Sequence, residues 1–344
     1  MKEPTPNFSE QIDAHKNAET VPDTIATLES AYGSRLSVRS RGCFITDFSV
    51  EEQTSGDSVP ILYSDEDLSV AKLTASHTMT PVGPSEGIGG QHGFARWADY
   101  HTFPQMDGPW ERKNIAFQAE RSDLGQGLVK QYELETNRLV IVTEALNYGS
   151  EPLQTSLGEH LYFSLPDEDT NGLKVNGSSL DELFGEGVEA SVMNGEPFFW
   201  DSFNGHPTNI DFTDGRQITL SAIVPRKSEE ILGMLIWHRP GSPSICFEPT
   251  VGFRSSTENT NLEIDPYDSV SLVTLIEVAS VGEPAERLIK KITPYLDPDH
   301  IEFLKQESMD FEYTLSYIYG ALLESGRDPD EVLSELGYSE SDEK

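Results

Sequence analysis

Short hydrophobic runs separated by turn residues dominate the middle of the chain. From about residue 36 to 280, segments rich in β-branched and aromatic residues recur between clusters of Gly, Asn, Asp and Pro. This spacing predicts the antiparallel strands of a large sandwich or barrel. The clearest segments are residues 68–78, 114–120, 128–135, 138–146, 217–224, 244–248 and 269–278. Residues 138–146 lack an amphipathic helical stripe, which favours a buried strand.

The N-terminal segment has a different, polar pattern. It carries Pro4, Pro6 and Pro22, and we expect residues 1–35 to form a loosely attached arm. Within this arm, residues 23–30 could form a short helix. The mainly β domain is then expected to span residues 36–282.

Apolar residues recur at helical spacing after residue 282. Helices are expected over 284–295, from 297 onward, over 311–325 with Gly326 as the terminator, and from Asp328. Residues 283–344 are therefore predicted to form a short helical C-terminal extension. Its apolar stripes could pack on the sandwich, join subunits in self-association, or bind another protein.

Charge narrows the range of partners. The 344 residues include 59 acidic and 24 basic side chains, which gives a net charge of −35. Nucleic acids and anionic membranes are both recognised through clustered Lys and Arg, so neither is an expected partner. The acidity fits a uniformly acidic soluble surface, or adaptation to a salty medium.

The sequence carries few signals for targeting, cofactors or metals. The first residues lack the apolar core of a signal peptide, and the longest nearly apolar run, residues 231–237, is too short to span a membrane, so we expect a cytoplasmic protein. Cys43 and Cys246 are too few for a disulfide scaffold and lack a partner at ligand spacing, so zinc is not expected. No nucleotide-binding motif occurs, and no cofactor is predicted.

Three segments carry candidate chemistry. Residues 89–97, GGQHGFARW, combine glycines that permit a tight turn with His92, the planar guanidinium of Arg96, and Trp97, on which a sugar could stack. The same string would also suit a loop whose histidine only caps a turn.

The other two segments each carry a single titratable group. His160 begins the aromatic segment HLYF and could transfer a proton near neutral pH, although a buried histidine beside aromatics is often only structural. Glu248 ends a mostly apolar run, which would desolvate its carboxylate and raise its basicity. In so acidic a chain, a solvent-facing glutamate is the simpler alternative.

The order of these motifs resembles the aldose 1-epimerase (mutarotase) family, in particular its hexose-phosphate-epimerase-like and uncharacterised branches. The matching segments lie between about residues 36 and 280: RGCFITDF from 41, PILY from 60, QHGFAR from 91, HLYF from 160, WHRP from 237 and CFEP from 246. The resemblance implies a galactose-mutarotase-type antiparallel β-sandwich with an open sugar groove, acting in carbohydrate metabolism.

The resemblance also implies residue roles. His160 matches the general acid that protonates the ring oxygen, and Glu248 the general base that takes the C1 hydroxyl proton, so an aldose would open and reclose as its other anomer. His92 and Arg96 match substrate-binding positions, and no metal is required. Trp97 is a candidate for stacking against a sugar because of its indole side chain, and not because of the resemblance.

Two departures affect the substrate. Phosphate-specific relatives carry an arginine before the first histidine, whereas residues 80–90 contain no Arg or Lys, so a free aldose is favoured over a sugar phosphate. The family's substrate-binding aspartate has no clear match. Asp201 is the first candidate, with Asp211 behind it.

Three functions follow from these features. The first is an aldose 1-epimerase-like isomerase. The second is a non-catalytic carbohydrate-binding protein of the same fold, and the third is an interaction protein acting through the helical extension.

Overall fold

The computed structural model describes most of the chain in separate stretches. These are residues 23–30, 33–51, 58–65, 74–82, 84–85, 90–102, 113–121, 125–165, 172–213, 215–225, 232–253, 262–279, 289, 292–306, 311–329 and 332–333. The contact pattern divides the chain into two compact units, Met1–Val50 with Val59–Ala279, and Glu51–Ser58 with Ser280–Lys344.

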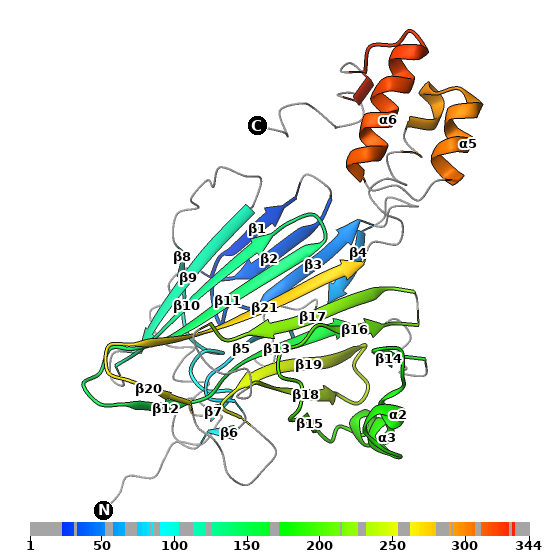
Figure 1. Ribbon diagram of the computed structural model, residues 1–344. Helices are drawn as coiled ribbons and strands as arrows, with labels where there is room; N and C mark the ends of the chain where they lie inside the picture. Colours follow the sequence, from blue (N-terminus) through cyan, green and yellow to red (C-terminus); the bar gives the residue numbers. More distant parts are fainter. Residues whose placement is uncertain are drawn as a thin grey trace, which may run out of the picture. The chain divides into compact units, whose positions relative to one another are not determined.

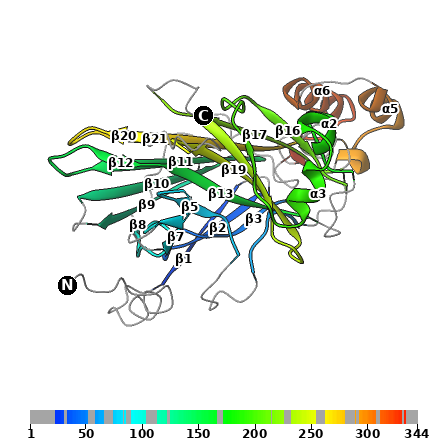
Figure 2. The ribbon, with the colours of Figure 1, turned by 90° about the horizontal axis from the view of Figure 1, so that it is seen from below.

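The first unit contains a nine-stranded sheet (Figure 1). Its strand order is β1 (Ile25–Glu29), β2 (Arg35–Arg39), β3 (Ile45–Glu51), β4 (Ser58–Leu62), β13 (Leu157–Ser164), β19 (Ser244–Val251), β18 (Leu232–His238) and β15 (Phe198–Trp200), with β5 (His77–Met79) paired to β13. Figure 2 shows β13 and β19, the two strands that matter most below, running next to each other.

An eight-stranded antiparallel sheet forms the other layer. Its order is β14 (Lys174–Val175), β16 (Thr208–Asp211), β17 (Gln217–Ile223), β21 (Ser269–Ala279), β11 (Arg138–Asn147), β10 (Gln126–Leu134), β9 (Lys113–Arg121) and β8 (His101–Thr102). Two short ribbons, β12 (Leu153–Thr155) with β20 (Leu262–Ile264) and β6 (Pro84–Ser85) with β7 (Gly90–Gln91), and the short helices α2 (Leu180–Phe184) and α3 (Val188–Met193) complete the described part of this unit.

One hydrophobic core lies between the two sheets. Phe163 and Phe247 of the nine-stranded sheet and Tyr132, Ile141 and Leu272 of the other are buried in this cluster. Strand β11 alternates between buried and half-buried positions along its whole length, as a strand with one face on the core does. Strands β13 and β19 instead bury nearly every residue, so both of their faces are covered. The side chains on their outer face therefore meet little water.

The predicted antiparallel sandwich is confirmed, and most predicted strands appear within a few residues of their expected bounds. The short helix that was one possibility for residues 23–30 does not form, because Ile25–Glu29 forms β1 and pairs with β2. Of the predicted strand at residues 68–78, the part before residue 74 lies outside the described residues, and β5 covers its end.

The second unit is helical where it is described. Helices α5 (Pro298–Gln306) and α6 (Phe311–Glu324) match the predicted ones, and Gly326 follows α6 with a φ of 71°. Residues 284–288 of the predicted first helix lie outside the described residues, and Thr293–Tyr295 forms a 3-10 turn, η2. Ile292, Ile318 and Leu322 share a separate small core. A role in self-association stays a prediction. None of the helices in the described part of the chain is long and apolar enough to cross a membrane.

A buried ion pair joins the two sheets across the core. Lys130 of β10 places its Nζ 2.8 Å from Oε2 of Glu159 on β13, and both side chains are almost fully excluded from water. The hydroxyls of Thr78 and Thr143 donate to Oε1 of Glu159 at 3.1 and 2.5 Å, and Lys130 also donates to the Thr78 hydroxyl. Every member of the network has a partner. The ion pair and its hydrogen bonds therefore offset the cost of burying two charges in the core.

Removing one member of this pair should destabilise the sandwich strongly. We expect Glu159→Gln to lower the free energy of unfolding by about 3–5 kcal/mol, since the Lys130 ammonium loses its counter-charge inside the core. Urea unfolding followed by fluorescence measures the change. The double variant Lys130→Met with Glu159→Gln should lose less than the sum of the single variants, and strictly additive losses would contradict the coupling.

Candidate active site

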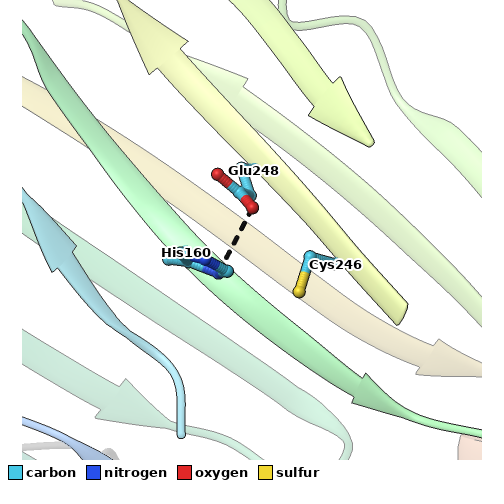
Figure 3. Close-up of side chains that lie close together, drawn as sticks. All are labelled: His160, Cys246 and Glu248. Atoms are coloured by element: carbon cyan, nitrogen blue, oxygen red, sulfur yellow. Dashed lines mark ion pairs between the residues drawn. The ribbon is translucent and has the colours of Figure 1, made fainter. Parts of the chain in front are cut away.

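The antiparallel register of β13 and β19 brings His160 opposite Glu248. The flanking pairs Gly158↔Thr250 and Leu161↔Phe247 fix this alignment. Because side chains alternate along a strand, Leu161 and Phe247 enter the core while His160 and Glu248 lie on the outer face of the sheet. Figure 3 shows the two side chains approaching each other from neighbouring strands.

The two side chains are in direct contact. Nδ1 of His160 lies 3.3 Å from Oε1 of Glu248, and the side chains are only 4% and 3% exposed. The distance is that of an ion pair, but Nδ1 forms no hydrogen bond of good geometry with any described residue. The sequence led us to expect these groups to flank an open groove. The structure brings them together in a nearly water-free position, and the groove stays a prediction.

Tyr162 orients the His160 ring. The two rings stack at 4.3 Å with an interplanar angle of 5°, and the Tyr162 hydroxyl lies 3.2 Å from Nε2 of His160. Burial raises the pKa of Tyr162 well above its usual value, so the phenol keeps its proton. When that proton is donated to Nε2, the imidazole proton sits on Nδ1 and faces Glu248.

Two further histidines surround His160. His77 of β5 is paired in register with His160, with ring centroids 5.0 Å apart, and the His92 ring meets His160 edge-on at 5.2 Å. Nδ1 of His77 lies 2.8 Å from the carbonyl oxygen of Ala75, which can only accept. Nδ1 therefore carries the proton, and Nε2, which is buried and has no hydrogen-bond partner among the described residues, is left as an acceptor.

The sequence reasoning found His92 but missed His77. His77 belongs to no glycine-rich or aromatic motif, and only its pairing with β13 brings it to the site. The sequence motifs did contain three further residues of this cluster, but they were not predicted to belong to the site: Tyr162, Trp237 and Cys246. Trp237 is half-buried and meets the His160 ring edge-on at 5.9 Å.

Burial keeps the titratable groups of this cluster uncharged. It lowers the pKa of His92 to about 3 and those of His77 and His160 well below 6.5, with nearby positive charge adding to the effect. Burial also raises the pKa of Glu248 well above 4.5. The resting pair is therefore a protonated carboxyl group beside a neutral imidazole.

Arg96 is the cation next to this cluster. Its guanidinium lies 5.3 Å from the centre of the Trp97 ring, and its charge contributes to the lowered pKa values of His77, His92 and His160. Burial in turn lowers the pKa of Arg96. Arg96 thus lies beside the histidines, and its role in substrate binding stays a prediction.

The two aspartate candidates lie farther along the sheets. Asp201 is exposed and directly follows β15, which β18 separates from β19. Asp211 ends β16 in the eight-stranded sheet, whereas His160 and Glu248 lie in the other sheet. A substrate-binding role for either residue stays a prediction.

The outer face also contains a set of potential metal ligands. Donor atoms of His160, Cys246 and Glu248 lie within 4.8 Å of one another, and all three residues are buried. This set was not predicted, because Cys246 has no second Cys or His at metal-binding spacing along the chain, and only the pairing of β13 with β19 brings His160 to it. Both cysteines are free thiols.

Backbone geometry places His92. The φ angles of His92 and Gly93 are 68° and 67°, and a Cβ on Gly93 would lie 1.7 Å from the carbonyl oxygen of Thr80. Only glycine fits this close backbone approach. Among the glycines of the string GGQHG, this close approach requires the one that follows His92.

Solved structures with the same fold include three mutarotase-related proteins. A galactose mutarotase-like protein from Lactobacillus casei has a TM-score of 0.56 at 16% identity and covers 74% of this chain and 100% of its own. A galactose mutarotase-related enzyme from Lactobacillus acidophilus has a TM-score of 0.56 at 13% identity, covering 75% and 98%. A galactose 1-epimerase from Lactobacillus acidophilus NCFM has a TM-score of 0.53 at 12% identity, covering 74% and 94%.

The structural likeness thus extends over about three quarters of this chain. No family model matches the sequence, and no curated protein matches it. At these identities the comparisons establish the galactose mutarotase-like fold, as the sequence motifs predicted.

Substituting Gly93 should disturb the site more than an ordinary turn glycine would. Gly93→Ala adds a methyl group to the contact with Thr80 and should lower the melting temperature by several degrees more than Gly177→Ala. Gly177 has a φ of 82° with nothing within 4 Å, so its substitution reports the cost of the backbone conformation alone. Thermal unfolding of the two variants measures the difference, and equal shifts would contradict the steric explanation.

Proposed function

We propose that this protein interconverts the α and β anomers of an aldose by acid/base ring opening and reclosure. The observation that carries the proposal is the contact of 3.3 Å between His160 and Glu248 on the outer face of a mutarotase-like sandwich. Ring opening requires one group to give a proton and another to take one. The ring oxygen and the C1 hydroxyl are bonded to the same carbon, so two adjacent side chains suit them.

Ring opening moves two protons. His160 donates one to the ring oxygen as the bond from that oxygen to C1 breaks, and Glu248 takes the proton of the C1 hydroxyl as the carbonyl forms. Rotation about C1–C2 then exposes the other face of the aldehyde. Reversal of both transfers closes the ring as the other anomer. The sugar is isomerised, and the pair ends with the number of protons it had at the start.

Substrate binding has to change the resting pair. At rest, burial favours the proton on Glu248, whereas the reaction starts with a carboxylate and an imidazolium. The two states differ only in whether the shared titratable proton is on Glu248 or on His160. A transfer within the pair therefore converts one into the other without exchange with solvent. Sugar hydroxyls that replace the direct contact would donate to the carboxylate and favour its charged form.

The surroundings suit an uncharged sugar better than a sugar phosphate. Nε2 of His77 is a buried acceptor for a sugar hydroxyl, and the three imidazoles are neutral. Arg96 is the cation that acts on all three histidines, Arg239 acts on Arg96 and Tyr162, and residues 80–90 contain no Arg or Lys. A free aldose such as glucose or galactose is therefore the proposed substrate class.

A non-catalytic carbohydrate-binding protein is the second candidate. The nearly complete burial of His160 and Glu248 favours it, because a hexose reaches the pair only after their direct contact opens. Binding of aldoses without anomer exchange in the experiments below would establish this alternative.

Removing the base should slow anomer exchange. We expect Glu248→Gln to lower the exchange rate by at least about 100-fold, the low end for a positioned acid–base group. NMR exchange spectroscopy or polarimetry of fresh α-glucose and α-galactose measures the rate. Glu277→Gln, at an exposed position of β21, is the matched control and should leave the rate unchanged. An unchanged rate in Glu248→Gln would contradict the assignment.

The rate of exchange should not decrease as the pH falls through 6.5. The active pair carries one proton, and a second is added only at the lowered pKa of His160. At higher pH the pair loses its single titratable proton and the rate falls. This alkaline limb is set by the pKa of Glu248, which burial raises well above 4.5. The charged and titratable neighbours in this environment are His77, His92, Arg96, Tyr162, Arg239 and Cys246. Measured with a metal chelator present, an acid limb centred at 6.5 would show instead that His160 titrates as an exposed histidine.

A further inference from the structure

Cys246 lies beside the proposed acid–base pair without a part in the sugar chemistry. It is two residues before Glu248 on β19, so both side chains are on the outer face of the sheet. Figure 3 shows its sulfur on the same side of the strand as the contact between His160 and Glu248. One nitrogen, one sulfur and one oxygen donor thus meet within 4.8 Å.

The spacing of these donors is close to that of a tetrahedral metal site. Bonds of about 2.0–2.3 Å to zinc place neighbouring ligand atoms roughly 3.3–3.8 Å apart. Nδ1 of His160 and Oε1 of Glu248 are already 3.3 Å apart. A side-chain adjustment of about 1 Å is therefore enough to close the set around one ion.

The charges of the three ligands match a divalent cation. A thiolate and a carboxylate together carry two negative charges, and a neutral imidazole carries none. The complex with a dication is therefore neutral overall, which a buried position requires. The sulfur ligand favours zinc over magnesium or calcium, which prefer oxygen ligands.

The orientation of His160 leaves a ligand atom available. Its Nδ1 is buried and lacks a hydrogen bond to any described residue, although it faces Glu248. Its Nε2 lies 3.2 Å from the Tyr162 hydroxyl, which can also accept the Nε2 proton. A hydrogen bond from the second ring nitrogen is the usual support of a metal-bound histidine.

We propose that His160, Cys246 and Glu248 form a binding site for one zinc ion, and that zinc bound there blocks sugar exchange. The binding itself is independent of the proposed function, whereas the inhibition rests on it. On binding, the hydrated ion exchanges water for the three side-chain donors, the Cys246 thiol and the Glu248 carboxyl each release a proton to the buffer, and no oxidation or reduction occurs. The bound ion then occupies both the proposed acid and the proposed base.

Cobalt(II) is the probe for the binding half, because a thiolate ligand gives it a charge-transfer absorption band. The full-length protein is first treated with a chelator and then titrated with cobalt(II), and zinc is added to displace it. We expect one cobalt ion per chain with a thiolate band. Cys246→Ser should lose the band and bind cobalt at least about tenfold more weakly. Even the loss of a residue that only hydrogen-bonds to a metal ligand typically lowers metal affinity about tenfold or more. Cys43→Ser is the matched control. Cys43 is buried in the core between the sheets, away from the outer face, so its substitution should leave the band intact.

Anomer exchange in the presence of zinc tests the inhibition half. Zinc should inhibit exchange by the unmodified protein and by Cys43→Ser, and Cys246→Ser should need about tenfold more zinc for the same inhibition. The site is overturned when the unmodified protein shows no thiolate band, or when Cys246→Ser binds cobalt as tightly as the unmodified protein. Exchange that persists with the site filled overturns the inhibition. A thiolate band in a protein without any exchange activity retains the metal site and rejects the proposed function instead.

Discussion

The buried ion pair between Lys130 and Glu159 constrains the rest of the structure. It joins the two sheets through the core, and its energy depends on Glu159 pointing inward. Since consecutive side chains of a strand point to opposite faces, an inward Glu159 forces His160 outward. The same ion pair that bridges the core therefore fixes the face on which the candidate acid lies, and the pairing of β13 with β19 brings Glu248 to it.

The outer face at His160 resembles a core in its exclusion of water but not in its chemistry. His77, His92 and Tyr162 surround His160 with aromatic rings, and their polar atoms are only partly matched by partners. Desolvation there opposes charge on every titratable group. An uncharged polyhydroxylated ligand can supply hydrogen bonds without adding charge, which supports the proposal of a free sugar as substrate.

Much of the sandwich was predictable because its strands carry strong local signals. Strands β11 and β21 are runs of apolar and β-branched residues without a helical stripe, which a single sequence displays directly. Strand β1 buries only Leu28, so its residues looked like a polar arm. The site followed a different rule. His160 and Glu248 were predicted from motifs, whereas the approach of His77 to His160, and of His160 to Cys246, depends on strand pairing, which local spacing does not encode.

The opposite orientations of Glu159 and His160 have a consequence for how this protein can change over evolutionary time. Inserting or deleting one residue in β13 before this point would reverse every side chain that follows, bringing the imidazole into the core and the carboxylate out of it. Such a change would lose the inter-sheet charge pair and the outer-face contact together. Length variation among descendants of this chain should therefore be confined to its loops, while β13 keeps its residue count.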